Sequence, residues 1–208
     1  MDDRMWFHGT EAEWLDLAKT KYWRQVQSSH MAVEREFDQL DPQTVQRLAP
    51  AQFYRWLHDK YFYWKFTAAN RLATTRRQLA KYLKDDPDFL QLQAIQRRLF
   101  DMDHNDAEAA LAVATSVRGL GPAGGSGLLA VLFPDDFGTV DVFVVEALRK
   151  VQSLPEHDRL VRMGNQLTLR EAALLIYILR RQARDLNAGF GSQHWTPRRV
   201  DMALWGDR

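Results

Sequence analysis

The chain has 208 residues, of which 46% are hydrophobic, and its formal net charge is +1 at neutral pH. This length and apolar content fit a globular protein with a sizeable core, built as one large domain or two small lobes. Cysteine is absent, which excludes disulfides and any zinc or iron–sulfur site with cysteine ligands. The N-terminus lacks the basic-then-apolar order of a signal peptide, and no apolar run approaches the roughly 20 residues of a membrane span. We therefore expect a cytoplasmic protein.

The first half of the chain predicts a succession of helices. Thr10 and Glu13 form a Thr-x-x-Glu capping box, which marks the start of a helix. Asp41 and Pro42 supply the N-cap and the first residue of another. The residues from 51 to 83 include neither proline nor glycine and predict one long helix through the middle of the protein.

The second half is organised around a glycine-rich turn. Residues 107–117 predict an alanine-rich helix, and the sequence Gly-Leu-Gly-Pro at 119–122 turns the chain into a second one. Glycine tolerates positive φ and close backbone approach, and proline suits the first helical position, where its missing N–H would have no intrahelical acceptor. A loop containing proline and two aspartates then leads to Asp141, at the start of a third helix.

Two further helices complete the prediction. Thr168 and Glu171 form a second capping box, and Thr196 with Pro197 starts a short last helix. The sequence has no persuasive strand pattern and no internal repeat. We predict a single all-α chain over residues 1–208, with a central functional segment at 107–150 flanked by helical segments at 1–106 and 151–208.

The central segment resembles the helix-hairpin-helix DNA glycosylases, the superfamily of endonuclease III and 8-oxoguanine glycosylase, in a bacterial branch. Their shared element is an apolar residue before Gly-x-Gly, then a helix, then a Val-Asp pair where a further helix begins. The corresponding residues here are Val117, Gly119, Gly121, Val140 and Asp141. The resemblance covers roughly 35 residues well, and the flanks match only as helical sequence of suitable length.

The resemblance implies a two-lobed helical fold, a DNA partner and a set of site residues. Asp141 stands where the family has its catalytic aspartate. In members that also cleave the DNA strand, a lysine occupies the position of Ala123, so alanine there implies base release by water alone. The residues expected to bind DNA phosphates are Arg118, Gly119, Leu120, Gly121 and Ala123. No cofactor or metal is implied, and the lack of cysteine excludes the iron–sulfur cluster that endonuclease III-type relatives often carry.

Asp141 also has a purely structural explanation, because aspartate is a favoured helix N-cap. The two roles are compatible. The N–H donors and the helix dipole keep a capping carboxylate ionised, and an ionised carboxylate can stabilise an oxocarbenium-like sugar or activate water. The apolar residues at 142–145 depart from the family, which often has polar or basic residues there. Asp135 and Asp136 are rival carboxylates that we interpret as loop caps.

The aromatic run at 53–66 has two interpretations. Its eight aromatic side chains are typical of a core helix. The alternative is that Tyr63, Trp64 or Phe66 lines a pocket that stacks a flipped base. The basic stretch that follows is either a solvated helix face or a DNA contact, with Asn70 and Arg71 as candidates.

The charge distribution favours DNA binding outside the central segment. Residues 51–100 carry ten Lys and Arg against four Asp and Glu, whereas residues 101–148 carry one against eight. Phosphate contacts at the turn would therefore rely on backbone N–H groups.

We expect a monofunctional base-excision glycosylase that acts on lesion-containing duplex DNA. We expect it to be a monomer associated with the nucleoid. Two alternatives remain open. One is a catalytically silent relative that binds DNA or a protein partner, and the other is a helical interaction module whose turn is only structural.

Overall fold

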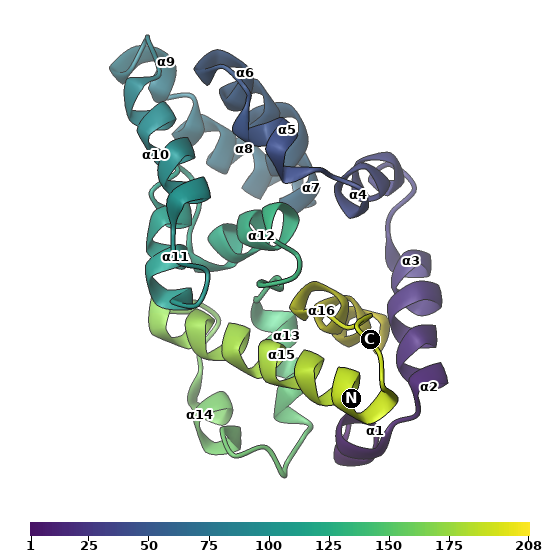
Figure 1. Ribbon diagram of the computed structural model, residues 1–208. Coiled ribbons are helices and arrows are strands. Elements are labelled where there is room, and N and C mark those ends of the chain that lie inside the picture. Colours follow the sequence, from purple (N-terminus) through teal and green to yellow (C-terminus); the bar gives the residue numbers. More distant parts are fainter.

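The computed structural model describes residues 1–208 and contains helices but no β-strand (Figure 1), which confirms the predicted all-α class. The first half comprises α1 (Asp3–His8), α2 (Glu11–Leu15), η1 (Asp16–Lys21), α3 (Tyr22–Gln25), α4 (Met31–Asp38), α5 (Pro42–Gln46), α6 (Pro50–Arg55), η2 (Trp56–Tyr61), α7 (Phe62–Lys65), α8 (Ala69–Leu79), α9 (Tyr82–Asp85) and α10 (Leu90–Asp101). The second half comprises α11 (Ala107–Thr115), α12 (Pro122–Leu132), α13 (Val142–Arg149), α14 (His157–Arg162), α15 (Leu169–Phe190) and α16 (Pro197–Gly206). The elements η1 and η2 are π-helical.

The predicted helix starts are confirmed where the signal was a cap. Both capping boxes form, with Thr10 and Glu13 at α2 and Thr168 and Glu171 at α15 exchanging side-chain and backbone hydrogen bonds. The Asp41 side chain accepts a hydrogen bond from the N–H at the start of α5. These signals succeed because each cap joins residues at most three apart and needs no tertiary partner.

The prediction of one helix across 51–83 is wrong. The chain forms one rod from α6 through η2 to α7, breaks at 66–68, and continues as α8. Phe66 leaves the helical region at φ −112° and ψ 83°, and its ring is buried edge-on to Phe62. Burial of that ring, rather than a proline or glycine, ends the rod at Lys65.

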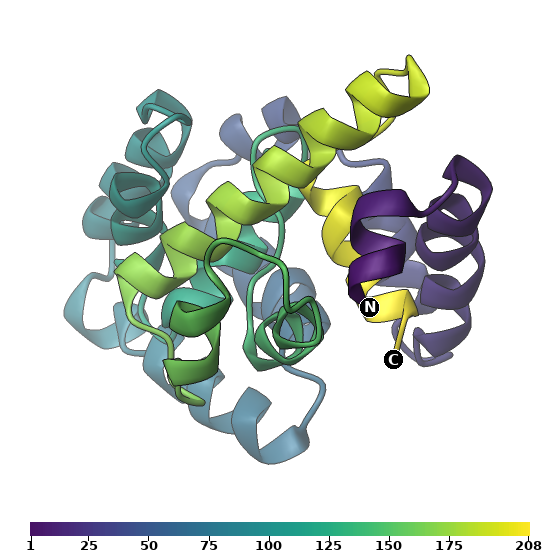
Figure 2. The same cartoon turned by 90° about the horizontal axis from the view of Figure 1, so that it is seen from below.

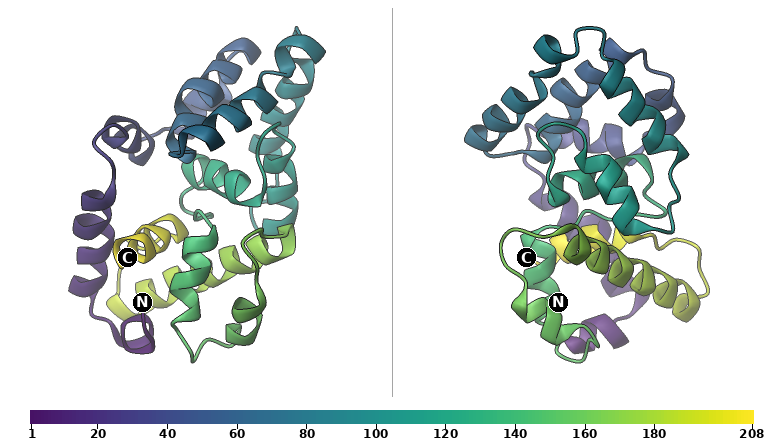
Figure 3. Two further views of the ribbon diagram at one scale, coloured as in Figure 1. Left: turned by 180° about the vertical axis from the view of Figure 1, so that it is seen from behind. Right: turned by 90° about the vertical axis from the view of Figure 1, so that its left-hand side faces the viewer.

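The helices gather in two groups that meet at α11 and α12 (Figures 1 and 3). One group contains α5, α6, α8, α9 and α10, and the other contains α1 and α13 to α16. The long α15 crosses the second group and packs on both α11 and α16. Both chain ends lie beside α1 and α16 (Figure 2). None of the helices combines the length and the apolar character that a bilayer crossing requires.

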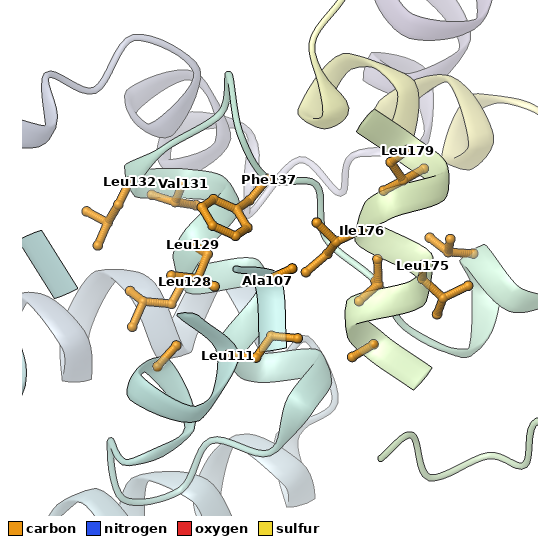
Figure 4. Packing of buried hydrophobic residues seen from close by; sticks show 14 of the residues in the cluster. Ala107, Leu111, Leu128, Leu129, Val131, Leu132, Phe137, Leu175, Ile176 and Leu179 are labelled. Carbon is orange, nitrogen blue, oxygen red and sulfur yellow. The ribbon is translucent and has the colours of Figure 1, made fainter. Parts of the chain in front are cut away.

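A single hydrophobic core of 55 buried residues extends through both groups. Figure 4 shows its centre, where side chains of α11, α12 and α15 interdigitate around Phe137. Every residue of α12 from Gly124 to Leu132 is buried. The second helix of the glycine turn, α12, is therefore part of the hydrophobic core, and only the residues at its N-terminus are accessible to solvent.

Candidate functional site

The turn between α11 and α12 presents backbone at the protein surface. Gly119 has φ +97°, and a Cβ at this position would lie 2.7 Å from the carbonyl oxygen of Thr75 on α8, so both conformation and space require glycine. Gly121 is different, because it is exposed, has an extended backbone, and would bring a Cβ near no other atom. Nothing inside the protein explains the glycine at position 121.

The N-terminus of α12 has no side-chain cap. Gly121 is the N-cap and Pro122 the first helical residue, and the N–H of Gly125 donates to the carbonyl of Gly121. The N–H groups of the first turn, including Ala123, therefore lack intrahelical acceptors. Such a helix start attracts anions through its N–H groups and the positive end of its dipole.

Ser126 ties the turn to the loop that carries the candidate carboxylate. Its hydroxyl donates to the carbonyl of Val140 at 3.1 Å and accepts from the N–H of Val140 at 3.0 Å. Thr139, one residue earlier, donates its N–H to Asp201 Oδ2 at 2.8 Å. The residues immediately before Asp141 are thus fixed to α12 and α16.

Asp141 is the N-cap of α13, as predicted. Its Oδ1 accepts hydrogen bonds from the N–H groups of Phe143 at 3.0 Å and Val144 at 3.4 Å. Its Oδ2 lies 3.7 Å from Nζ of Lys65, and the aspartate side chain remains 15% exposed. The carboxylate is therefore partly accessible, with both oxygens facing positive charge or N–H donors.

Lys65, the last residue of α7, is the site residue that sequence reasoning missed. Its side chain is only 11% exposed, and Asp141 is its ion-pair partner. Burial lowers the pKa of the Lys65 amine, and the carboxylates of Asp141 and Asp201 act in the opposite direction. No motif could have revealed the pair, because the lysine belongs to an aromatic run far from Asp141 in the chain.

A buried charge cluster lies next to this pair. Arg198 on α16 places Nη2 2.8 Å from Glu34 Oε1 and Nη1 2.7 Å from Asp201 Oδ2. Asp201 is fully buried, its Oδ1 has no hydrogen-bond partner, and burial raises its pKa. The cluster joins α4 to α16 and, through Asp201, to the loop before Asp141.

The aromatic candidates all have structural partners. Trp64 and Phe66 are buried in the core, and the indole N–H of Trp64 donates to Glu34. Tyr63 is half-buried, with its ring stacked on His30 at 4.4 Å between centroids and its hydroxyl bonded to the Ser29 carbonyl. None of the three side chains is free to stack on a base in this structure.

The basic residues divide into engaged and free side chains. Arg118 pairs with Asp85 at 2.8 Å and stacks on Tyr82, while Arg76 donates to the carbonyl of His58. Arg180 is held by the carbonyl oxygens of three residues near the start of α11 and in the 133–141 loop. By contrast, α8 and the residues after it carry exposed cations without an ion-pair partner, namely Arg71, Arg77, Lys81 and Lys84. Asn70 is also exposed, and its Oδ1 accepts the N–H of its neighbour Arg71.

The predicted phosphate-binding residues come together as one turn, although they differ in accessibility. Leu120 is buried, Arg118, Gly119 and Ala123 are half-buried, and Gly121 is exposed. Two pockets, of about 320 and 140 Å³, lie beside α1, and Asp141 lines neither of them. No group of three or more His, Asp or Glu side chains is placed to hold a metal ion.

Comparison with known proteins found no match for this chain among family models, curated proteins or solved structures.

Proposed function

We propose that this chain is a DNA-binding protein of the helix-hairpin-helix glycosylase type, and that it releases a damaged base from duplex DNA by hydrolysis at Asp141. In this proposal α11, the turn at 116–121 and α12 form the hairpin. The two groups of helices that meet there correspond to the two lobes of that fold. The observation that carries the proposal is the double hydrogen bond between Ser126 and Val140, which makes the exposed turn and Asp141 parts of one rigid unit.

The turn suits a DNA phosphate because its backbone can be approached closely. Gly121 has no side chain to hold a strand away, and the uncapped start of α12 offers N–H donors. The carbonyl of Thr75 on α8 lies against Gly119, so α8 runs beside the turn. Its free cations, with those just after it, would neutralise neighbouring phosphates. The cations of α8 and of the residues just after it, next to the turn, would thus compensate for the acidic character of the central segment.

Asp141 suits the chemistry of base release because its carboxyl group is oriented and partly accessible. The bond between the sugar C1′ and the base nitrogen breaks, positive charge develops on the sugar, and water then adds its oxygen to C1′. The proton from water leaves the sugar, and the departing base is protonated. A fixed carboxylate stabilises the developing charge or accepts the proton of the attacking water. Ala123 offers no amine at the family's lysine position, so the DNA strand stays intact.

The alternative is a silent relative that binds DNA without cleaving a glycosidic bond. It is favoured by the engagement of both Asp141 oxygens, which already have partners within the protein.

A duplex panel distinguishes the two. The purified protein is incubated with duplexes that each carry one oxidised, alkylated or deaminated base, and the products are resolved with and without alkali. Strand breaks that appear only after alkali support monofunctional base release. Tight duplex binding without base release from any substrate supports the silent relative, and absence of DNA binding contradicts both.

A further inference from the structure

Lys65 lies against Asp141, yet the proposed function assigns it no role. Its Nζ is 3.7 Å from Asp141 Oδ2, and neither residue has another ion-pair partner. The two side chains come from elements far apart in the chain, α7 and the start of α13, and both are largely buried. Such a pair is costly to bring out of water and persists only where the surrounding structure holds it.

The fold leaves room for this lysine. A Cβ at position 127 of α12 would lie 3.1 Å from Cδ of Lys65, 3.3 Å from its Cε, and 2.9 Å from the hydroxyl of Tyr61. Within a helix, glycine is about 1 kcal/mol less favourable than alanine, so Gly127 weakens α12 intrinsically. Its position is explained by the Tyr61 hydroxyl and the Lys65 stem, which both lie close to where a Cβ would be.

The amine also interacts electrostatically with two carboxylates. Asp141 and Asp201 both act on Lys65, and Asp141 adds to the effect of burial that raises the pKa of Asp201. The nearby cation Arg198 is already bonded to Asp201 and Glu34. Lys65 is therefore the cation that offsets the repulsion acting on Asp141.

We propose that Lys65 is a positioning residue for Asp141. The amine holds Oδ2 while the N–H groups of Phe143 and Val144 hold Oδ1, so the ionised carboxylate keeps one orientation at the edge of the hairpin. This inference rests on the proposed function and deepens it. Without the amine, Oδ2 has no ion-pair partner and the carboxylate can rotate, and a displacement of about 1 Å in a reacting group can reduce the rate about a hundredfold.

The first test measures base release by Lys65→Met and Lys65→Arg, on whichever lesion the wild-type chain processes. Lys60→Met is the matched control, because Lys60 lies on the same rod in an exposed pair with Glu36. Lys65→Met should lower the single-turnover rate about tenfold or more, with unchanged duplex affinity, and Lys65→Arg should restore part of it.

Two results of this test would overturn the proposal. One is a Lys65→Met protein that releases the base at the rate of the wild type. The other is covalent trapping of Lys65 by borohydride on a duplex with an abasic site, which would make the amine a reactant instead of a positioning group.

The second test does not depend on activity. Carbon-13 labelling of lysine side chains allows the Lys65 amine to be titrated by NMR in the wild type and in Asp141→Asn. The midpoint should lie below that of Lys60 and fall further when Asp141 loses its charge, and an unchanged midpoint in the variant would overturn the proposal. If the wild-type chain releases no base, the proposed function fails. In that case, a Lys65 midpoint that is lower in Asp141→Asn than in the wild type still supports Lys65 as the residue that positions Asp141.

Discussion

The carboxylate of Asp141 combines two tasks that are separable by substitution. As an N-cap it needs only an acceptor for the N–H groups of Phe143 and Val144, which asparagine supplies about as well as aspartate. As the proposed catalytic group it needs a negative charge. A substitution at Asp141 can therefore remove the proposed catalytic charge while the hydrogen bonds at the start of α13 are retained.

Asp141→Asn should abolish most base release and keep DNA binding. The rate should fall about a hundredfold or more, because the developing positive charge on the sugar loses its fixed anion. Quantified product from the duplex panel measures this, with circular dichroism as the check on folding. Asp135→Asn is the matched control, since Asp135 is exposed in the same loop, and it should behave as the wild type. Equal loss in both variants would contradict a specific role for Asp141.

At the scale of elements, the turn between α11 and α12 and the adjoining α8 form the surface proposed to meet DNA. Two glycines in this turn differ in kind. Gly119 is required by the fold, through its positive φ and its contact with Thr75, whereas the space beside Gly121 is empty. Substitutions at these positions should therefore separate folding from binding.

Gly121→Val should lower stability by no more than about 1 kcal/mol, because valine is a poorer helix N-cap than glycine, and it should weaken binding to duplexes of every sequence. Its side chain would point into the space that we assign to the DNA backbone. Gly119→Ala should instead destabilise the protein by about 1 kcal/mol or more, because alanine is strained at positive φ and meets the Thr75 carbonyl. Urea unfolding and fluorescence-anisotropy titrations give the two quantities. Full duplex affinity in a folded Gly121→Val protein would remove the turn from the interface.

The neighbouring arginines of α8 offer a second contrast. Arg77 is exposed and unpaired, whereas Arg76 donates two hydrogen bonds to the His58 carbonyl. Arg77→Gln should reduce the slope of log affinity against log salt by about one, as expected for one lost phosphate contact. Arg76→Gln should lower stability and leave the slope unchanged. If Arg76→Gln reduced the salt slope and Arg77→Gln lowered stability, α8 would present another face to DNA.

At the scale of the whole molecule, the buried cluster around Arg198 connects segments from both ends of the chain. The guanidinium joins Glu34 on α4 with Asp201 on α16, and Asp201 in turn holds Thr139 in the loop before Asp141. Removing one member of such a cluster leaves its partners charged and unpaired in the interior.

Arg198→Met should lower the free energy of unfolding by about 3–5 kcal/mol, as measured by urea denaturation. Arg184→Met, at an exposed position of α15 without an ion pair, should change it by less than about 0.5 kcal/mol. The Arg198→Met loss should be smaller in acid. Burial raises the pKa of folded Asp201 above its unfolded value, near 3.9, and Arg198 lowers it. Without Arg198 the folded pKa therefore rises further, so proton binding favours the folded variant more than the folded wild type. That contribution is present below the unfolded value and is lost as pH rises through the folded one. A loss independent of pH would contradict this account.

The sequence by itself determined the features whose causes are local. Capping residues and their partners lie within three positions of each other, so α2, α5 and α15 could be placed from Thr10, Asp41 and Thr168. The glycine turn and the capping role of Asp141 were predictable for the same reason, because backbone conformation and N-cap chemistry are properties of short segments.

Tertiary structure alone decided the rest. The break at Phe66 follows from burial of its ring beside Phe62, and no local signal marks it. The division of arginines into free and engaged side chains depends on which carbonyls and carboxylates the fold brings near them. Lys65 lies beside Asp141 because the end of α7 packs against α12 at Gly127, so that three segments distant in the chain come into contact. The packing of the core determines which charged side chains become neighbours, and it brings together residues that lie far apart in the sequence.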